Sequence, residues 1–308
     1  YNSLLDKIDN NYSLDIYFAM ARGFQEDGID VTASEMTKWF DTNYHYMVPE
    51  FTKDQTFKLT SEKFLNEYNE AKAAGIETKP VVIGPITYLL IGKEKDAGFD
   101  RIDLIDRLLP VYEEIISKLA DAGAKYIQID EPYLALDIDA KVKALYKTVF
   151  EKLNTAAKGA KLIATTYFEA LKDNEDLAAS LPVHALHLDL VRSENQLDTV
   201  LAKVPASLTL SLGVVEGRNI WKNDYEKSLD KIQQAVATLG KDRVWVGTSS
   251  SLLHVPYDLD SEKKEETLPA EVKNWLAFAK QKLAEVKDLA VLADGQVDAA
   301  TAERFQAN

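Results

Sequence analysis

The chain has 308 residues, of which 46% are hydrophobic and 28% are charged, a composition typical of a folded globular protein rather than a disordered one. Its 50 acidic residues outnumber its 36 Lys and Arg residues, and a net charge of −14 disfavours nucleic acid and anionic membranes as general partners. The absence of cysteine excludes disulfides, thiolate nucleophiles and metal sites built on sulfur.

The N-terminal stretch of the chain begins with Tyr1 and has neither the basic region nor the apolar core of a secretion signal. Because the first residue is not Met, we expect the chain to be a piece of a longer polypeptide. No apolar run reaches the ~18 residues that a membrane-spanning helix needs. These features together favour a cytoplasmic protein.

Short apolar runs alternate with longer stretches of helical periodicity along the chain. Near-continuous apolar runs are typical of parallel strands that are buried on both faces. The spacing predicts one α/β domain with a parallel sheet, rather than two smaller domains. The expected strands are residues 81–83, 126–129, 162–165, 186–190, 208–212 and 244–246, with a weaker run at 44–48.

Apolar residues at three- and four-residue spacing predict helices between these strands. A helix over 104–120 is expected to be disturbed by Pro110, and one over 225–239 should end at Gly240. Further helices are expected at 141–153 and, after Pro269, at 270–292. The polar tail after Leu292 indicates a final helix or the start of a linker. No dinucleotide-binding or P-loop motif is present.

The segment 36–50 is dense in aromatic residues and contains one lysine, Lys38. Flat aromatic surface beside a cation suits a conjugated, anionic ligand. The alternative is that the aromatic residues are core and that Lys38 only extends its amine to solvent.

Polar side chains follow six successive predicted strands, at the ends where βα barrels place their working residues. Asp130 and Glu131 follow one strand and could be a general acid and base or an ammonium site. Since adjacent residues on a strand point to opposite faces, we do not expect them to share one pocket. The alternative is that one of them caps the next helix or pairs with a basic neighbour.

Two further sets of strand-end residues have both a chemical and a structural interpretation. His187 and Asp189 share one face of a strand and could begin a metal site, or they could form a hydrogen-bonded polar layer. The serines 249–251 could include a nucleophile, but without a G-x-S-x-G elbow a backbone-bonding turn is favoured. The remaining polar strand-end residues are Thr87, Thr165, Thr166, Arg192, Glu216, Arg218 and His254.

Seven sequence strings, in order along nearly the whole chain, resemble the N-terminal half of cobalamin-independent methionine synthase. They are SEMTKWFDTNYHYMVPEF (34–51), KPVVIGPITYLL (79–90), YIQIDEP (126–132), TTYFE (165–169), LHLDLV (186–191), GVVEGRNIWKND (213–224) and SSSLLHVP (249–256).

The resemblance implies an enzyme that transfers a methyl group from 5-methyltetrahydropteroyl-triglutamate to homocysteine without cobalamin. It implies two βα barrels related by duplication, with the catalytic zinc in a C-terminal barrel that this chain lacks. The N-terminal barrel would brace that partner and help to bind the glutamate tail of the folate. The resemblance also matches Lys38 to the lysine with which members of the family contact that glutamate tail.

In the zinc-bearing barrel of the family, the segments equivalent to 165–168, 186–191 and 248–254 carry the metal ligands. Here hydroxyl residues and Asp189 stand at those positions, so no zinc and no cofactor is expected in this chain. Asp130 would correspond to a substrate-amine site, kept for structure. Asp130 and Asp189 would therefore mark a remnant pocket, and no catalytic residue is expected.

The resemblance also implies a TIM-type (β/α)8 barrel with about six of its eight strands, the first strands being absent. We expect a lead-in segment at 1–50, a barrel domain at 51–292 and the start of an interdomain linker at 293–308. The chain alone should be inactive, with weak folate binding. The alternatives are a folate-polyglutamate-binding or purely structural domain, or a glycosidase-like barrel that uses Glu131 with Asp189.

Overall fold

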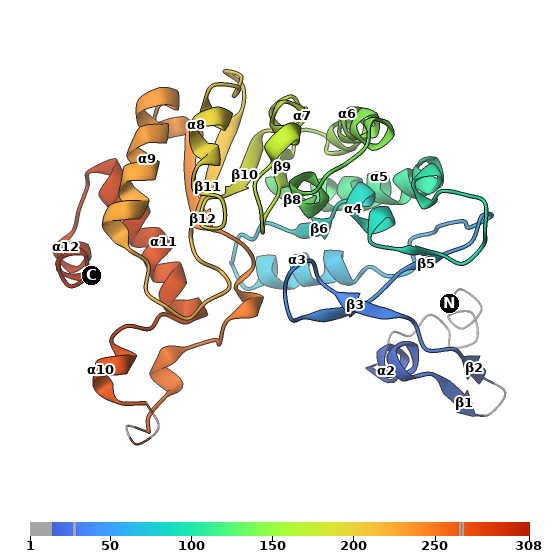
Figure 1. Cartoon of the computed structure of the whole chain (residues 1–308), viewed down its shortest axis with the longest axis horizontal. Coiled ribbons are helices and arrows are strands. Elements are labelled where there is room, and N and C mark those ends of the chain that lie inside the picture. The colour runs from blue at the N-terminus through green and yellow to red at the C-terminus, as the bar shows by residue number, and fades with distance from the viewer. Residues whose placement is uncertain (1–13, 27–28, 265, 267) are drawn as a thin grey trace. The chain divides into compact units, whose positions relative to one another are not determined.

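The computed structural model describes residues 14–26, 29–264, 266 and 268–308 (Figure 1). Six strands form one sheet in the order β12-β11-β10-β9-β8-β6, and the ladders β6–β8 and β9 to β12 are parallel. The strands are β6 (Val81–Ile83), β8 (Tyr126–Asp130), β9 (Lys161–Thr165), β10 (Ala185–Asp189), β11 (Thr209–Val215) and β12 (Val244–Thr248). All six were predicted from their apolar runs, with only their ends shifted.

Helices alternate with these strands, which is the pattern of a βα barrel. The predicted (β/α)8-type architecture with six strands is therefore confirmed. The helices are α3 (Lys63–Ala73), α4 (Pro85–Leu90), α5 (Ile105–Asp121), α6 (Ala140–Ala156), α7 (Glu175–Ala179), α8 (Gln196–Leu201), α9 (Tyr225–Leu239), α11 (Ala279–Asp294) and α12 (Ala299–Gln306).

Short elements precede and interrupt the sheet. The weak run at 44–48 is β4 (His45–Met47), which pairs antiparallel with β3 (Met36–Lys38) in a separate hairpin. The other short elements are α2 (Leu14–Arg22), β1 (Phe24–Glu26), β2 (Ile29–Val31), β5 (Glu50–Phe51), β7 (Lys93–Glu94) and α10 (Ala270–Lys273). Residues 1–13 of the expected lead-in segment lie outside the described residues.

The contacts divide the chain into two compact units. The first unit is Tyr1–Tyr133 with Ile138–Leu162, and the second is Leu134–Asp137 with Ile163–Asn308. In the first unit, α5 buries Leu108, Ile116 and Leu119, residues at the spacing that predicted the helix. Pro110 does not interrupt α5, contrary to expectation. It lies on the exposed side, as does Asp106 one turn earlier, where water can reach the backbone.

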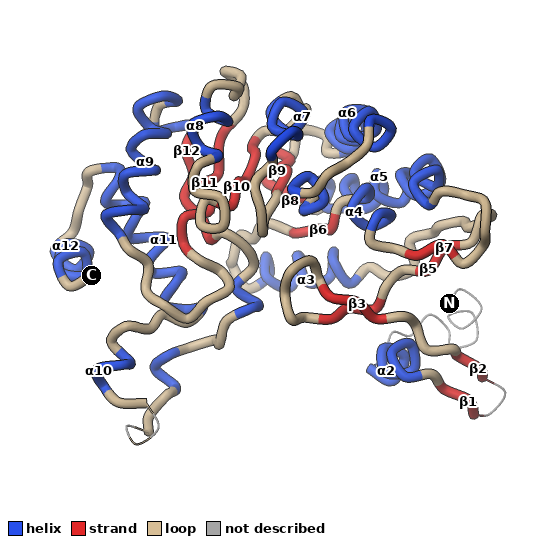
Figure 2. Tube along the Cα trace, viewed as in Figure 1, coloured by secondary structure: helices blue, strands red, loops and turns tan. Residues whose placement is uncertain are grey.

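In the second unit, every residue of β10 is buried. Helices α9 and α11 pack beside each other and against β12 (Figure 2). The prediction of one long helix over 270–292 is wrong, because α10 ends at Lys273 and α11 begins at Ala279. Between them the chain pairs with the segment after β11, through a bridge from Leu276 to Trp221 and a 2.9 Å hydrogen bond from the Lys222 N–H to the Trp275 carbonyl.

The tail after Leu292 contains helix α12, whose first turn is capped by Asp298. Among the helices of the described residues, none combines the length and the apolar character needed to cross a membrane.

Candidate functional site

Lys38 is the last residue of β3, in a hairpin whose turn is held by Thr42. The Thr42 hydroxyl donates to the Trp39 carbonyl at 2.7 Å, and its oxygen accepts from the Tyr44 N–H at 3.1 Å. Thr42 is 2% exposed. Because the side chain that closes the turn is buried, the hairpin presents Lys38 in a defined direction.

The hairpin register separates its cation from its aromatic rings. Lys38 lies opposite His45, and Thr37 lies opposite Tyr46. Since alternate strand residues point to opposite faces, Lys38 and His45 share one face, and Tyr46 with Trp39 occupy the other, their ring centroids 5.1 Å apart. The expectation of aromatic surface beside the cation is therefore wrong for these two rings.

The face that carries Lys38 is open to an anionic ligand. Lys38 and His45 are both exposed. No residue that the structure describes makes a hydrogen bond or ion pair with Lys38. A lysine whose charge is not neutralised by a neighbour can bind the carboxylate of a ligand.

A cavity of about 550 Å³, lined by both apolar and polar side chains, adjoins the same segment of the first unit. Its wall includes Phe51, whose ring centroid lies 6.0 Å from that of Phe57 and 5.7 Å from that of Tyr88. Met47, the partner of Met36 across the hairpin, also lines it. The cavity has the size and lining of a small-molecule pocket.

Glu131 is fully buried and caps α4 rather than facing a substrate. Its carboxylate oxygens accept hydrogen bonds from the N–H groups of Ile86 and Thr87 at 3.2 and 2.8 Å. The Thr87 hydroxyl donates at 2.6 Å and the Tyr146 hydroxyl at 3.5 Å. Burial raises the pKa of Glu131 to about 7, against these donors, which lower it. Glu131 thus has a capping role, but on α4, which precedes it in the chain, and not on the next helix as the alternative predicted.

Asp130 is half-buried at the end of β8 and faces a different set of groups. Its carboxylate accepts from the Gln128 amide at 2.6 Å, and Gln128 in turn accepts from the Lys79 ammonium. Asp130 and Glu131 therefore do not converge on one pocket, as the strand geometry predicted.

Asp189 is 1% exposed and braces two loops of the second unit. One oxygen accepts from the Phe168 N–H at 3.0 Å, and the other accepts from the N–H groups of Val191 and Arg192 at 3.0 and 2.9 Å. Burial raises the pKa of Asp189, while these backbone donors act to lower it. The carboxylate is already used by the backbone, which is a structural role.

His187 lies on the same strand, and its Nδ1 is 2.8 Å from the Ser211 hydroxyl. This contact agrees with the hydrogen-bonded polar layer, which was one of the two interpretations of His187 and Asp189 from the sequence. In the part of the chain that the structure describes, no three His, Asp or Glu side chains are grouped to hold a metal ion. With Asp189 occupied by three N–H groups and hydroxyls in place of thiolates, these positions do not fit zinc.

Of the three serines after β12, Ser251 makes the local backbone-bonding turn that was favoured from sequence, and Ser249 bonds a distant backbone group. The Ser249 oxygen accepts from the Gly217 N–H at 3.1 Å, and the Ser251 oxygen accepts from the Leu253 N–H at 3.2 Å. Ser250 is 5% exposed, and its hydroxyl has no hydrogen-bond partner among the described residues. None of the three serines has the surroundings of an activated nucleophile.

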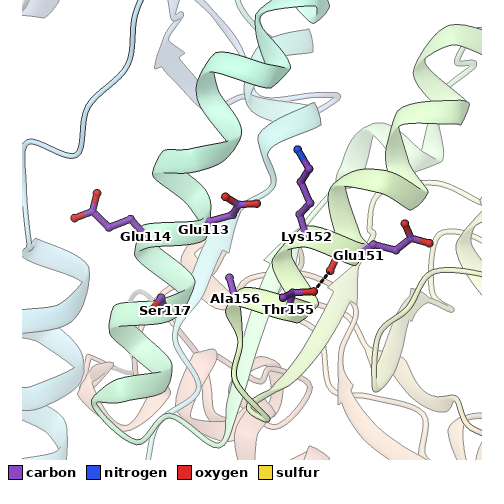
Figure 3. Close-up of a pocket in the computed structure, with 7 residues that line it drawn as sticks. All are labelled: Glu113, Glu114, Ser117, Glu151, Lys152, Thr155 and Ala156. Atoms are coloured by element: carbon purple, nitrogen blue, oxygen red, sulfur yellow. Dashed lines mark hydrogen bonds between the residues drawn. The ribbon is translucent and has the colours of Figure 1, made fainter.

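A groove between α5 and α6 lies on the surface of the first unit (Figure 3). The carboxylates of Glu113, Glu114 and Glu151 point in different directions and the Lys152 amine points away from them, as Figure 3 shows. The one hydrogen bond drawn there, from the Thr155 hydroxyl to the Glu151 carbonyl, is internal to α6. The groove gathers no converging groups and is not a candidate site.

Sequence reasoning missed His45 and Tyr146, and it named Thr87 as a strand-end residue without predicting its contact with Glu131. His45 could have been found from the hairpin register, since the segment 39–44 is a turn that places it opposite Lys38. Thr87 and Tyr146 hold Glu131, but they are 44 and 15 residues away from it in sequence. No local signal predicts contacts between such distant positions.

The comparisons with known proteins place these features in a family. Residues 4–240 match the family model described as cobalamin-independent synthase, N-terminal domain. The chain is 54% identical over 301 residues to a 5-methyltetrahydropteroyltriglutamate–homocysteine methyltransferase of Flavobacterium johnsoniae, covering 97% of this chain and 39% of that protein. It is 55% identical over 292 residues to the same enzyme of Cytophaga hutchinsonii, covering 94% of this chain and 38% of that protein.

Among solved structures, the chain is similar to a B12-independent methionine synthase from Shewanella sp. W3-18-1 in complex with selenomethionine. The TM-score is 0.57 at 15% identity, over 82% of this chain and 72% of that one. At this identity the likeness shows the fold alone, and it agrees with the six-stranded βα architecture. The chain spans about two fifths of the length of the curated relatives it matches.

Proposed function

The chain belongs to the N-terminal domain family of the cobalamin-independent synthases, and from this we propose that it serves as the N-terminal, non-zinc domain of a 5-methyltetrahydropteroyltriglutamate–homocysteine methyltransferase. The whole enzyme would transfer the methyl group of the folate to homocysteine and form methionine. This proposal is supported by relatives of that name that match nearly the whole of this chain. The enzyme would act in the cytoplasm.

Within that enzyme, we propose that residues 51–292 are the barrel domain, with a lead-in segment at 1–50 and the start of an interdomain linker at 293–308. The zinc would be held by a C-terminal barrel, which this domain braces. A site for zinc in this chain would need thiolates, and the chain has no cysteine. The glycosidase alternative is not supported, because Glu131 and Asp189 are 0% and 1% exposed and bonded to backbone N–H groups.

The observation that carries the folate part of the proposal is the exposed face of the β3–β4 hairpin. Lys38 and His45 lie opposite each other on that face, and Lys38 has no ion-pair partner among the described residues. A triglutamate tail carries more carboxylates than a monoglutamate and would gain from such a cation. Because Lys38 is exposed, one such pair contributes only about 0.5 to 1 kcal/mol.

We predict that the chain binds the triglutamate form of methyltetrahydrofolate roughly threefold to fivefold more tightly than the monoglutamate form, and that Lys38→Ala removes this difference. Titration calorimetry at low ionic strength measures both affinities. The matched control is Lys93→Ala, another exposed lysine on a short strand of the first unit, which should keep the preference. Equal affinity of the unmodified chain for both forms would instead indicate a purely structural domain.

A further inference from the structure

Four side chains that the proposed function does not use are brought together where β9, β11 and β12 end in the second unit. The Arg218 guanidinium carbon lies 5.0 Å from the centroid of the Phe168 ring, and the His254 ring centroid lies 5.8 Å from the same ring. Ser250 lies against Gly217, the residue before Arg218: a Cβ at Gly217 would come within 2.6 Å of the Ser250 hydroxyl. A cation and an imidazole thus lie against one aromatic ring, and the hydroxyl lies against the residue that precedes the cation.

The backbone that places this ring is strained. Phe168 has φ 78°, in the left-handed region that bulky residues rarely adopt. Its N–H donates to the buried Asp189 carboxylate at 3.0 Å, and its ring contacts that of Tyr167 at 4.6 Å. The surrounding structure therefore enforces this conformation. Such enforced strain clusters at ligand-binding and catalytic sites.

Two buried hydroxyls at these strand ends lack hydrogen bonds. Ser250 and Thr166 are 5% and 1% exposed, and across the described part of the chain nothing bonds to the hydroxyl of either one. Thr166 lies two residues before Phe168, and Ser250 lies beside Gly217. Because buried polar groups in folded proteins are nearly always bonded, each of these two hydroxyls is a group that a ligand or a bound water would complete.

Arg218 is the one cation among these side chains, and the two nearby carboxylates are already hydrogen-bonded. Glu216 accepts from the Arg218 N–H at 3.0 Å and from the Ser249 hydroxyl at 3.5 Å, and the Asp189 carboxylate is occupied by three backbone donors. Burial and the Arg218 charge lower the pKa of His254, which favours its neutral imidazole. Arg218 is half-buried, and its planar guanidinium can donate two parallel hydrogen bonds to a carboxylate.

We propose that the strand ends of the second unit form a carboxylate-binding subsite, in which Arg218 binds the carboxylate and the hydroxyls of Ser250 and Thr166 supply further hydrogen bonds. The carboxylate could come from a γ-linked glutamate tail or from a free amino acid. The inference uses residues of the second unit alone and does not depend on the role of Lys38.

The test is titration calorimetry of the chain with two probes, γ-linked triglutamate and free L-glutamate. We expect binding of at least one probe, and a loss of at least tenfold in its affinity in Arg218→Ala, because the only charge-assisted contact of the site is removed. The matched control is Arg22→Ala, which removes an arginine stacked 5.2 Å from the Phe18 ring on the surface of the first unit. Unchanged affinity in Arg218→Ala, or no binding of either probe to the unmodified chain, would overturn the proposal.

Ser250→Ala separates a ligand-binding role from a structural one. If the hydroxyl forms a hydrogen bond only with a ligand, its removal lowers the probe affinity about threefold. The melting temperature of the free protein then stays unchanged or rises. A lower melting temperature with unchanged affinity would show a structural role and contradict the proposal. Arg218→Lys, which keeps the charge and loses the fork, gives a second test with less risk to folding: its affinity should fall between those of the unmodified chain and Arg218→Ala.

The same titrations in Lys38→Ala distinguish this proposal from the proposed folate role. Loss of affinity in Arg218→Ala but not in Lys38→Ala supports the subsite and removes the role of Lys38. The reverse result removes the subsite and supports Lys38. Binding of triglutamate alone identifies a glutamate tail as the source of the carboxylate, and equal binding of L-glutamate identifies a free amino acid.

Discussion

Glu131 shows how one buried side chain can look catalytic in sequence and be structural in the fold. A carboxylate directly after a barrel strand is where a general acid would stand. Here the N–H groups at the start of α4 and the hydroxyls of Thr87 and Tyr146 surround it. The perturbed pKa that marks many active sites arises at Glu131 from burial in a structural network.

The pKa of Glu131 makes stability depend on pH. Its pKa is about 7 in the folded state, above the value of 4.5 for a free glutamate, so the folded state binds the proton more tightly. Stability from this group is therefore present below pH 4.5 and is lost as pH rises to about 7, by about 3 kcal/mol in total. We predict that the difference in unfolding free energy between the unmodified chain and Glu131→Gln changes with pH. The value for the unmodified chain should fall relative to that of the variant as pH rises from 4.5 to about 7.

Urea denaturation at several pH values measures this difference, since glutamine has the shape of glutamate but does not titrate. Tyr146→Phe, which removes only the weak 3.5 Å contact, should retain the pH dependence of the unmodified chain. A difference between the unmodified chain and Glu131→Gln that stays constant with pH would show that Glu131 keeps an ordinary pKa.

Gly84 is needed because Glu131 occupies the space of a side chain there. A Cβ at Gly84 would come within 2.1 Å of the Glu131 carboxylate oxygen. We predict that Gly84→Ala destabilises the chain by about 2 to 4 kcal/mol, because either the cap or the backbone must shift. Thermal unfolding followed by circular dichroism checks this. Gly247→Ala, where the nearest atom is at 3.7 Å, is the control and should have little effect.

At the scale of elements, helix α12 depends on a buried acid of α11. Asp288 is 1% exposed and forms two 2.6 Å hydrogen bonds with Arg304 of α12. Burial acts to raise the pKa of Asp288, but the bonds from Arg304 and Tyr225 outweigh it and lower the pKa. The pair therefore attaches α12 to the second unit and keeps the buried carboxylate charged.

We predict that Arg304→Ala lowers the unfolding free energy by about 1 to 3 kcal/mol, because it leaves the buried Asp288 without its cation. The effect is limited because Arg304 itself is half exposed and its charge is screened by water. Differential scanning calorimetry measures the change. Lys241→Ala removes an exposed ion pair with Asp294 on the same helix and should change stability by less than about 0.5 kcal/mol. Equal effects of the two variants would contradict a structural role of the Asp288–Arg304 pair.

Two elements show how tertiary contacts override local patterns. The apolar spacing of residues 270–292 is helical throughout, yet 275–277 leave the helix to pair with 220–222. Conversely, Pro110 should interrupt α5, yet the helix continues through it. The Asp106 carbonyl, which loses its helical donor because proline has no N–H, lies on the exposed side, where water can reach it. In both cases the deciding contact, or its absence, lies outside the local sequence.

At the scale of the whole molecule, the relatives matched here are about two and a half times longer than this chain. In the function proposed above, a zinc ion held outside this chain would bind the homocysteine thiolate, and this chain has no cysteine to hold that metal. We predict that the chain alone forms no methionine above the blank from homocysteine and methyltetrahydropteroyl-triglutamate. Product chromatography checks this, with the Flavobacterium johnsoniae relative assayed in parallel. Methionine formation near the rate of that relative would contradict the assignment of a non-zinc domain.

The sequence by itself determined the family, the six parallel strands and the absence of thiolate chemistry. These follow from residue identity and from apolar runs of adjacent residues, which are local properties of the chain. It also predicted that Lys38 is a candidate anion contact and that Asp130 and Glu131 diverge.

Only the tertiary structure decided which polar residues are structural. Glu131 accepts an N–H at the start of a helix from 45 residues earlier, Asp189 accepts an N–H from 21 residues away, and His45 lies opposite Lys38 through the hairpin register. Arg218, Phe168 and His254 come together because parallel strands end at the same edge of the sheet. The physical reason is that hydrogen bonds and burial depend on contacts between distant segments, whereas strand and helix periodicity depends on neighbours in the chain.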